Sequence, residues 1–258
     1  MIPPYSSPNL PPEAFRISPS QIAKFFEMPS VWYTEQVLGE KQFFGSTATE
    51  LGTITHYIAE QSAKGVSVTP KEVEEYISSI ENLEVDKDVL LSNYTEMGSA
   101  VVNQYVATNV PDETEYETSH EIAPGIYIAG TVDFRVNENT LYSNVLGDYK
   151  TASTKPNTDN IPWKYFIQLM AYAIADKARG IHTDTLRIVY IVKRTKTLPV
   201  RVFVVNKLLT PKDWDDAADA INLIVETIQT DIENPMLRHL LFKSMSLKQG
   251  PTPTEFPA

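Results

Sequence analysis

Residues 126–152 read IYIAGTVDFRVNENTLYSNVLGDYKTA, two segments of alternating polar and apolar residues separated by Asn137-Glu138-Asn139. Alternation with many Val, Ile, Thr and Tyr residues is typical of β-strands, and an Asn-rich interruption is typical of a turn. The stretch therefore predicts two adjacent antiparallel strands, over 126–136 and 143–151.

Each of these two strands carries acidic residues on one face. Residues two apart in a strand point the same way, so Thr131, Asp133 and Arg135 are expected on one face of the first strand. In the second strand Asp148 and Lys150 share a face. The other face of the first strand is expected to carry Val132, Phe134 and Val136.

A short turn would place Asp133 across from Asp148, with Lys150 beside them. Two close carboxylates suit Mg²⁺ or Mn²⁺, and a lysine can orient an attacking water or neutralise charge on phosphorus. The alternative for this motif alone is an ordinary surface Asp–Lys pair.

The rest of the chain predicts an α/β domain around these strands. Helical patterns cover 18–28, 47–65, 70–81, 86–108, 162–179 and 211–231, and strand patterns cover 114–122, 186–193 and 200–205. This order predicts a central mixed β-sheet flanked by helices, with a helical N-terminal part. We expect an irregular arm over 1–16, a single domain over 17–245 (helical part 17–112, sheet core 113–207, last helix 211–231) and a flexible tail over 246–258.

The composition excludes several classes of protein. With 258 residues, of which 42% are hydrophobic, the chain can bury a core and is not a disordered protein. No apolar run approaches the ~18 residues of a membrane helix, and the first thirty residues lack a secretory signal pattern. The absence of cysteine removes disulfides, thiol nucleophiles and cysteine-held clusters. These features predict a cytoplasmic protein.

The charge is unevenly distributed along the chain. The net charge is −11, yet residues 151–207 hold ten Lys or Arg against three Asp, whereas residues 50–121 hold fifteen acids against three lysines. A basic segment in an acidic chain predicts that a polyanion binds along 151–207 and avoids the acidic helices. The expected phosphate contacts are Lys155, Lys164, Lys193, Arg194 and Lys196. A solvated basic face is the alternative.

Three polar residues inside apolar helical patterns are further candidates. Gln168 and Tyr172 lie four apart and so share one face of the helix that follows the Lys150 strand. If buried they need partners, which a catalytic lysine or a phosphate would supply. His56, in GTITHYIAE, suits Mn²⁺ as a ligand, and a core histidine is the alternative.

Taken together, five motifs in this order resemble the PD-(D/E)XK nuclease superfamily, in particular its RecB-like exonuclease branch. The resemblance covers residues 17–206 and rests on SPSQIAKFFEMPSVWYTEQVLG, LGTITHYIAE, GTVDFRV, LGDYKTA and QLMAY. It implies a restriction-endonuclease-like core.

The resemblance also implies a role for each matching residue. Metal ligation falls to His56, Asp133 and Asp148, with the carbonyl of Tyr149 as a further ligand. Lys150 would activate or position the attacking water, and Gln168 and Tyr172 would orient the phosphate and the lysine. Glu121 matches a position that is sometimes acidic, and a solvated glutamate at a strand end is its alternative.

The sequence departs from many relatives at one point. Met28-Pro29 stands where those relatives have a Cys-Pro that helps to hold an iron–sulfur cluster, so no such cluster is expected. The absence of a Walker A motif means that any ATPase activity would come from another polypeptide.

The resemblance implies a Mg²⁺- or Mn²⁺-dependent deoxyribonuclease, an exonuclease of DNA recombination, repair or phage DNA processing. It would work on DNA in the bacterial or phage-infected cytosol, with no membrane, and with a recombination or single-strand-binding protein or a second copy as candidate partners. One alternative is a catalytically silent nuclease-fold protein that binds DNA or assists assembly. The other alternative is an acidic adaptor.

Overall fold

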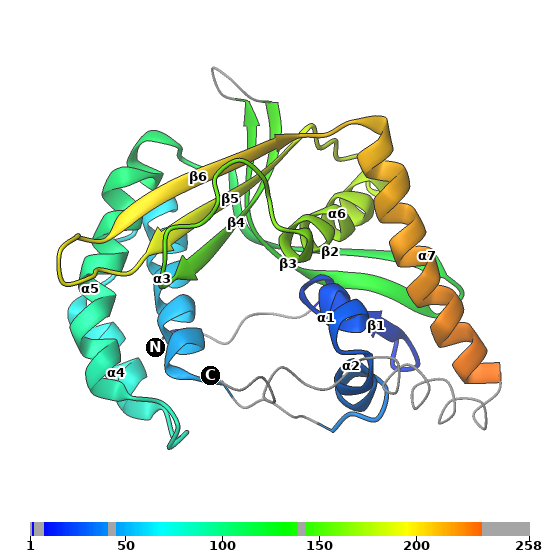
Figure 1. Cartoon of the computed structure of the whole chain (residues 1–258), viewed down its shortest axis with the longest axis horizontal. Helices are drawn as coiled ribbons and strands as arrows, with labels where there is room; N and C mark the ends of the chain where they lie inside the picture. The colour runs from blue at the N-terminus through cyan, green and yellow to red at the C-terminus, as the bar shows by residue number, and fades with distance from the viewer. Residues whose placement is uncertain (1, 3–7, 41–44, 139–142, 234–258) are drawn as a thin grey trace, which may run out of the picture.

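The structure is a computed structural model that describes residues 2, 8–40, 45–138 and 143–233. A six-stranded mixed sheet forms its centre and helices cover both faces (Figure 1), which confirms the predicted fold class. The strands are β1 (Phe15–Ile17), β2 (Glu113–Ala123), β3 (Ile126–Glu138), β4 (Ser143–Ala152), β5 (Thr185–Val192) and β6 (Arg201–Leu208).

The sheet order is β1-β3-β4-β5-β6, and β2 also pairs with β3. β1 runs parallel to β3 and β4 parallel to β5, whereas the other neighbours are antiparallel. A parallel pair needs a crossover connection, and α6 (Trp163–Ala178) supplies it between β4 and β5.

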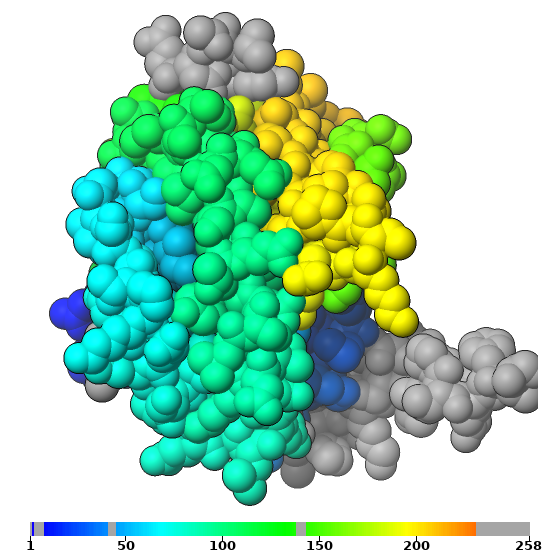
Figure 2. Space-filling view, turned by 90° about the vertical axis from the view of Figure 1, so that its left-hand side faces the viewer, coloured from blue at the N-terminus to red at the C-terminus, as the bar shows by residue number. Residues whose placement is uncertain are grey.

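The remaining helices divide between the two faces of the sheet. The first core cluster packs residues of α1 (Ile22–Glu27), α2 (Pro29–Gln36), α6 and α7 (Pro211–Glu233) on one face. The second core cluster packs residues of α3 (Thr47–Ala63), α4 (Pro70–Ser79) and α5 (Lys87–Gln104) on the other. Figure 2 shows that α4 and α5 form the surface of this second side. Short 3₁₀ turns, η1 (Pro19–Gln21) and η2 (Val106–Thr108), precede α1 and follow α5.

Side-chain caps determine where the helices of the second side begin. The Ser46 hydroxyl accepts the Thr49 N–H at the start of α3, and Asp86 accepts the Val89 N–H at the start of α5. Thr69 forms a reciprocal capping box with its third helical residue at the start of α4. Such oxygens satisfy amide groups that have no partner in the first helical turn, so these starts agree with the sequence pattern.

Two elements were not predicted. The expected irregular arm over 1–16 ends too late, because Phe15 and Arg16 already belong to β1 and lie opposite residues of β3. A three-residue strand is too short to show alternation. α2 follows Met28 without a regular apolar period. The domain limits stay predictions, and the tail from residue 246 and Asn139 of the expected turn lie outside the described residues.

The alternation along β3 breaks at Asp133. Val132 belongs to the first core cluster, whereas Phe134 and Val136 belong to the second, so the prediction that these three share a face is wrong. β3 pairs with β4 only from Phe134 onward, and before Phe134 it pairs with β2, whose Glu115, at the level of Asp133, has a positive φ of 48°. A period of two holds only along an undistorted strand.

Gly147 is required by the Phe134 ring, which lies across β4 at this point. A Cβ atom on residue 147 would be 1.9 Å from the ring, far inside any allowed contact. The same ring packs against Tyr149, with 4.7 Å between centroids. This close packing holds β3 and β4 together at the last position before they separate.

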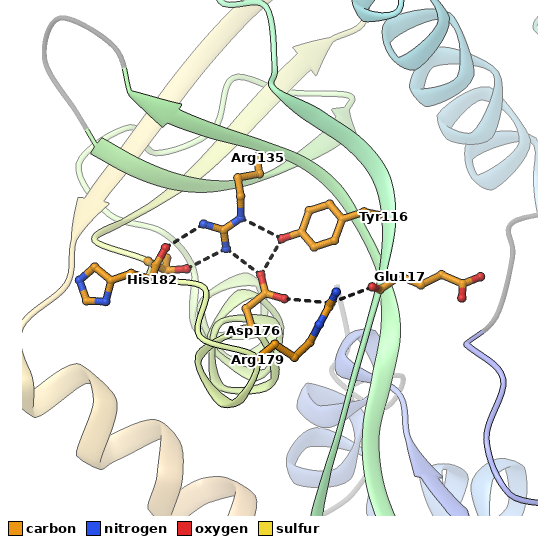
Figure 3. Close-up of polar contacts among 7 residues, drawn as sticks. Tyr116, Glu117, Arg135, Asp176, Arg179 and His182 are labelled. Atoms are coloured by element: carbon orange, nitrogen blue, oxygen red, sulfur yellow. Dashed lines mark hydrogen bonds and ion pairs between the residues drawn. The ribbon is translucent and has the colours of Figure 1, made fainter.

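A buried ion pair joins α6 to β3 (Figure 3). Arg135 donates to the Asp176 carboxylate at 2.7 Å, and both side chains are almost fully buried. Tyr116 donates to the same carboxylate oxygen at 2.6 Å, while the Arg135 guanidinium also reaches the His182 carbonyl and the Thr183 hydroxyl. The network therefore fixes the end of α6 against β2 and β3.

Within the described ranges, no helix combines the length and the apolar character needed to cross a membrane.

Candidate active site

A cavity of about 600 Å³ is lined by residues of β3, β4, α3 and α6, at the place where β3 and β4 separate. The ribbons of these four elements can be followed in Figure 1. The β3–β4 pairing ends at Phe134 and Gly147: before Phe134 β3 pairs with β2, and beyond Gly147 β4 pairs with β5. Such a fork exposes the ends of two strands from one sheet to the same space. Its lining includes His56, Glu115, Asp133, Asp148, Lys150, Gln168 and Tyr172.

The fork brings together the two aspartates and the lysine of the strand motifs. The register of the preceding pair places Asp133 next to Asp148, as the sequence predicted. Lys150 Nζ lies 2.6 Å from Asp148 Oδ2, so these two share a face. The Tyr149 N–H donates to Asp133 Oδ2 at 2.7 Å, and its side chain lies in the second core cluster.

His56 reaches this group from α3. Its Nδ1 lies 3.2 Å from Asp133 Oδ2, and it makes a hydrogen bond to the Tyr149 backbone. Burial, together with the charge of Lys150, lowers the pKa of His56 to about 4, although Asp148 opposes the shift. A neutral imidazole is the form that ligates metals. The backbone of Tyr149 thus lies in the cavity, while its role as a ligand stays a prediction.

Gln168 and Tyr172 both face the cavity from α6. Gln168 Nε2 donates to Asp148 Oδ1 at 3.3 Å, so in this structure it orients the carboxylate rather than the lysine. Tyr172 lies over Gly130, where a Cβ atom would come within 3.0 Å of its ring. The glycine makes room for the tyrosine beside the carboxylates.

Glu115 is a site residue that the sequence reasoning missed. Three ligand atoms, one each from His56, Glu115 and Asp133, all lie within 4.8 Å of one another. A register shift between Glu121 and Ala123 moves β2 by one residue against β3. Without that bulge Tyr116 would lie opposite Asp133. Glu115 could therefore have been predicted only from the register of the β2–β3 hairpin, including its bulge.

Glu121, the predicted secondary acid, lies elsewhere. Its side chain is exposed at the far end of β2 and accepts the Gly125 N–H at 2.8 Å. Glu115, six residues earlier on the same strand, occupies the cavity instead. The prediction placed the acid on the correct strand at the wrong end.

The five predicted phosphate contacts are divided among separate places, and none lines the cavity. Lys155 and Lys164 lie over the rings of Phe203 and Tyr165. Lys193, Arg194 and Lys196 belong to the β5–β6 connection, where Arg194 lies 3.5 Å from Glu96 of the acidic α5. Besides Lys150, the cavity is lined by a basic residue that the sequence reasoning missed, Arg16 of β1, whose Nε donates to the Ala129 carbonyl.

The prediction that DNA avoids the acidic helices at 50–121 stays a prediction, and α3, which lies in this region, forms one wall of the cavity. The α3 residues that line it are Ala48, Thr49, Gly52, Thr53 and His56, none of which is acidic. The acidic residue of region 50–121 that lines the cavity is Glu115, which comes from β2 and not from this wall.

Comparisons with known proteins agree with this geometry. The family model of the PD-(D/E)XK nuclease superfamily matches residues 16–238. The chain belongs to the PD-(D/E)XK nuclease superfamily. No curated protein sequence matches it.

Two solved structures are similar to this member of the superfamily. One is a Eubacterium rectale protein assigned as an exonuclease, with 14% identity, 84% of this chain and 80% of that chain covered, and a TM-score of 0.57. The other is LHK-Exo in complex with dAMP, with 12% identity, 91% and 96% covered, and a TM-score of 0.43. The first similarity shows the shared fold.

Nucleases of this superfamily use divalent metal ions, and the charges of the cavity fit one. Three carboxylates, Glu115, Asp133 and Asp148, face the single ammonium of Lys150. Burial raises the pKa of Asp148 to about 6, with Asp133 adding to the shift and Lys150 opposing it. Burial and Asp133 raise the pKa of Glu115 to about 9. A divalent cation would balance this surplus of acidic groups and take oxygen and imidazole ligands.

The same groups raise the pKa of Lys150. Burial opposes its charge, but the carboxylates of Asp148 and Asp133 outweigh burial. Lys150 is therefore an ammonium ion that pairs with the Asp148 carboxylate.

Asp148→Asn is expected to stabilise the metal-free protein at pH 8. The folded-state pKa of Asp148 is raised, so its contribution to stability is full below about pH 4 and is lost as the pH rises through about 6. The raised pKa means that the folded protein disfavours the ionised carboxylate at pH 8, and asparagine removes this cost while Asp133 remains beside Lys150. Thermal unfolding in EDTA at pH 8 and pH 4.5 measures the effect. A variant that gains as much stability at pH 4.5 as at pH 8 would contradict it.

Proposed function

We propose that the chain is a Mg²⁺- or Mn²⁺-dependent deoxyribonuclease that hydrolyses phosphodiester bonds from a DNA end. The observation that carries the proposal is the convergence of Asp133, Asp148 and Lys150 in one cavity at the fork of the sheet. Metal ions are held by close carboxylates, and a charged lysine beside them acts on a phosphate.

Each residue of the cavity has a task in this reaction. His56, Glu115, Asp133 and Asp148 would hold the metal, together with the carbonyl of Tyr149. A bound divalent metal supplies Lewis-acid stabilisation of the phosphate oxygens. Lys150 positions the attacking water and offsets charge that develops on phosphorus. Gln168 keeps the Asp148 carboxylate in place, and Tyr172 closes the cavity wall beside the phosphate.

Arg16 extends the proposal to substrate binding. It is a cation at the edge of the cavity, beside Tyr172, and the face of α3 across from it is neutral. A phosphate that enters between β1 and α3 would therefore meet Arg16 and the neutral side chains of α3. The basic residues of the β5–β6 connection are farther out, and Arg194 is already paired.

The exonuclease mode rests on the RecB-like motifs and on the assignment of the similar Eubacterium rectale protein. A task in DNA recombination, repair or phage DNA processing, a cytoplasmic setting and a protein partner or second copy remain proposals of the same origin. The alternative, a silent nuclease-fold DNA-binding protein, is disfavoured because the full set of acidic, basic and amide groups converges in one cavity.

The proposal predicts metal-dependent loss of linear DNA. End-labelled linear duplex, end-labelled single strands and covalently closed circles are incubated with Mg²⁺, Mn²⁺, Ca²⁺ or EDTA. Linear DNA should be degraded with Mg²⁺ and Mn²⁺, and closed circles should survive, because only the former offers an end. Cleavage of circles at the linear rate would make the protein an endonuclease. Binding without cleavage under every metal condition would favour the silent alternative.

A further inference from the structure

One residue from each of three neighbouring strands forms a row that begins at Lys150. In the strand registers Lys150 of β4 lies beside Tyr190 of β5, and Tyr190 lies beside Phe203 of β6. Tyr165 of α6 packs on Tyr190, with 6.2 Å between ring centroids. We call Tyr165, Tyr190 and Phe203 the aromatic row. It connects the candidate active site with the edge strand of the sheet.

Cations lie over both of the partly exposed rings of the aromatic row. Lys150 and Lys164 have their Nζ atoms 5.2 and 4.8 Å from the Tyr165 centroid. At Phe203 the cations are Lys155, at 5.6 Å, and Arg201, at 5.3 Å. An exposed cation–ring contact is worth only about 0.5–1 kcal/mol, so a phosphate can draw the cation away and leave the ring to a base.

These outer cations lack acidic partners. Among the described residues, Lys155, Lys164 and Arg201 have no carboxylate within salt-bridge distance, in contrast to Lys207, which pairs with Asp213 at 2.9 Å. The aromatic row thus offers alternating rings and uncompensated positive charge. This is the pattern that binds unpaired nucleotides, which present a ring face and a phosphate at each step.

Two buried polar atoms support a ligand at the row. Within the described part of the chain, the Tyr190 hydroxyl and the Arg201 Nε are buried without a hydrogen-bond partner. Tyr190 is only 4% exposed. Buried polar groups normally have partners, so both atoms are donors that a bound phosphate or base would satisfy.

We infer that the aromatic row binds single-stranded DNA and leads it to the candidate active site. In a duplex the faces of the bases are stacked on one another, so only an unpaired strand can place bases on Tyr165 and Phe203. Two strand spacings, about 10 Å, separate β4 from β6. That distance accommodates roughly two or three nucleotides of a stacked strand at ~3.4 Å each. The inference rests on the proposed nuclease function, because it names the form of DNA that reaches the same site.

Fluorescence anisotropy with labelled oligothymidine and with a labelled blunt duplex tests the inference. Both are titrated in EDTA, where nothing is cut. Phe203→Leu and Tyr165→Leu should each raise the Kd for oligothymidine by about 5- to 150-fold, the equivalent of about 1–3 kcal/mol per stacked base. The Kd for the duplex should change less than about twofold. Phe203→Trp, which keeps a ring, should retain the affinity for oligothymidine.

Trp214→Leu is the matched control. Its ring also carries a cation, Lys177 at 4.6 Å, but lies on α7 outside the aromatic row. It should leave both Kd values unchanged. If Phe203→Leu proves unstable on heating, Lys155→Met and Lys164→Met replace it. Each should then lower the slope of log affinity against log salt for oligothymidine by about 0.7.

Equal losses for both DNA forms, or no loss for oligothymidine, would overturn the inference. Because these titrations need no cleavage, they separate it from the proposed function. If the protein degrades DNA but the aromatic-row variants bind oligothymidine normally, the nuclease proposal holds and the aromatic row does not bind DNA. If the aromatic-row variants lose affinity for oligothymidine but the protein cuts no DNA, the aromatic row binds DNA and the nuclease proposal is wrong.

Discussion

Asp148→Asn and Lys150→Ala are each expected to lower metal-dependent DNA cleavage by at least about 100-fold, which is about 2.7 kcal/mol on the barrier. The reason is geometric, because the two side chains lie 2.6 Å apart at the centre of the cavity and next to Asp133. Under the proposed function, removing the carboxylate takes away a metal ligand. Removing the ammonium takes away the group proposed to position the water and offset charge on the phosphate.

Single-turnover rates on end-labelled DNA measure this loss, and α7 offers a matched control. Lys212 and Asp216 form the same type of pair at 2.6 Å, but on an exposed helix surface. Lys212→Ala and Asp216→Asn should cleave within about twofold of the unaltered protein, and any contaminating nuclease would appear in all variants alike. If both cavity variants cleave within about tenfold of the unaltered rate, the active-site assignment is contradicted.

Arg135→Met is expected to lower the free energy of unfolding by about 3–5 kcal/mol. It leaves the buried Asp176 carboxylate with the weaker ion pair to the exposed Arg179, at 3.8 Å, and removes the guanidinium that also donates to the Tyr116 hydroxyl (Figure 3). Because breaking a buried pair leaves an uncompensated charge, the cost exceeds that of the lost contact itself. Urea unfolding followed by circular dichroism gives the difference.

A double-mutant cycle separates the pair from its surroundings. Arg135→Met combined with Asp176→Leu removes both charges and should cost less than the sum of the two single variants. Lys212→Ala, at an exposed pair, should cost no more than about 1 kcal/mol. A loss below that value for Arg135→Met would mean that the network contributes little to holding α6.

Local sequence determined the elements that carry the site. Alternation along 143–151 is a property of neighbouring residues, so it correctly placed Asp148 and Lys150 on one face and Tyr149 on the other. The spacing of four between Gln168 and Tyr172 likewise placed both on the α6 face that lines the cavity. The helices predicted over 47–65 and 70–81 begin as predicted, and Ser46 and Thr69 cap them, because a cap acts within one turn.

The non-local features needed the tertiary structure. A one-residue bulge near Glu121 decided that Glu115 faces Asp133, and no local pattern reports such a shift. The fork between β3 and β4 moved Val132 to the other core cluster, although the alternation of the sequence is regular there.

The charged residues also show the difference between local and non-local features. The sequence alone identified the basic segment 151–207, but which of its cations are paired depends on neighbours distant in sequence. Arg194 meets Glu96 of α5, and Lys155 meets the ring of Phe203 on β6. A sequence determines periods and caps because these act between residues a few positions apart. Strand register, the fork of the sheet and the partners of each charge arise from contacts between distant segments, which only the folded chain brings together.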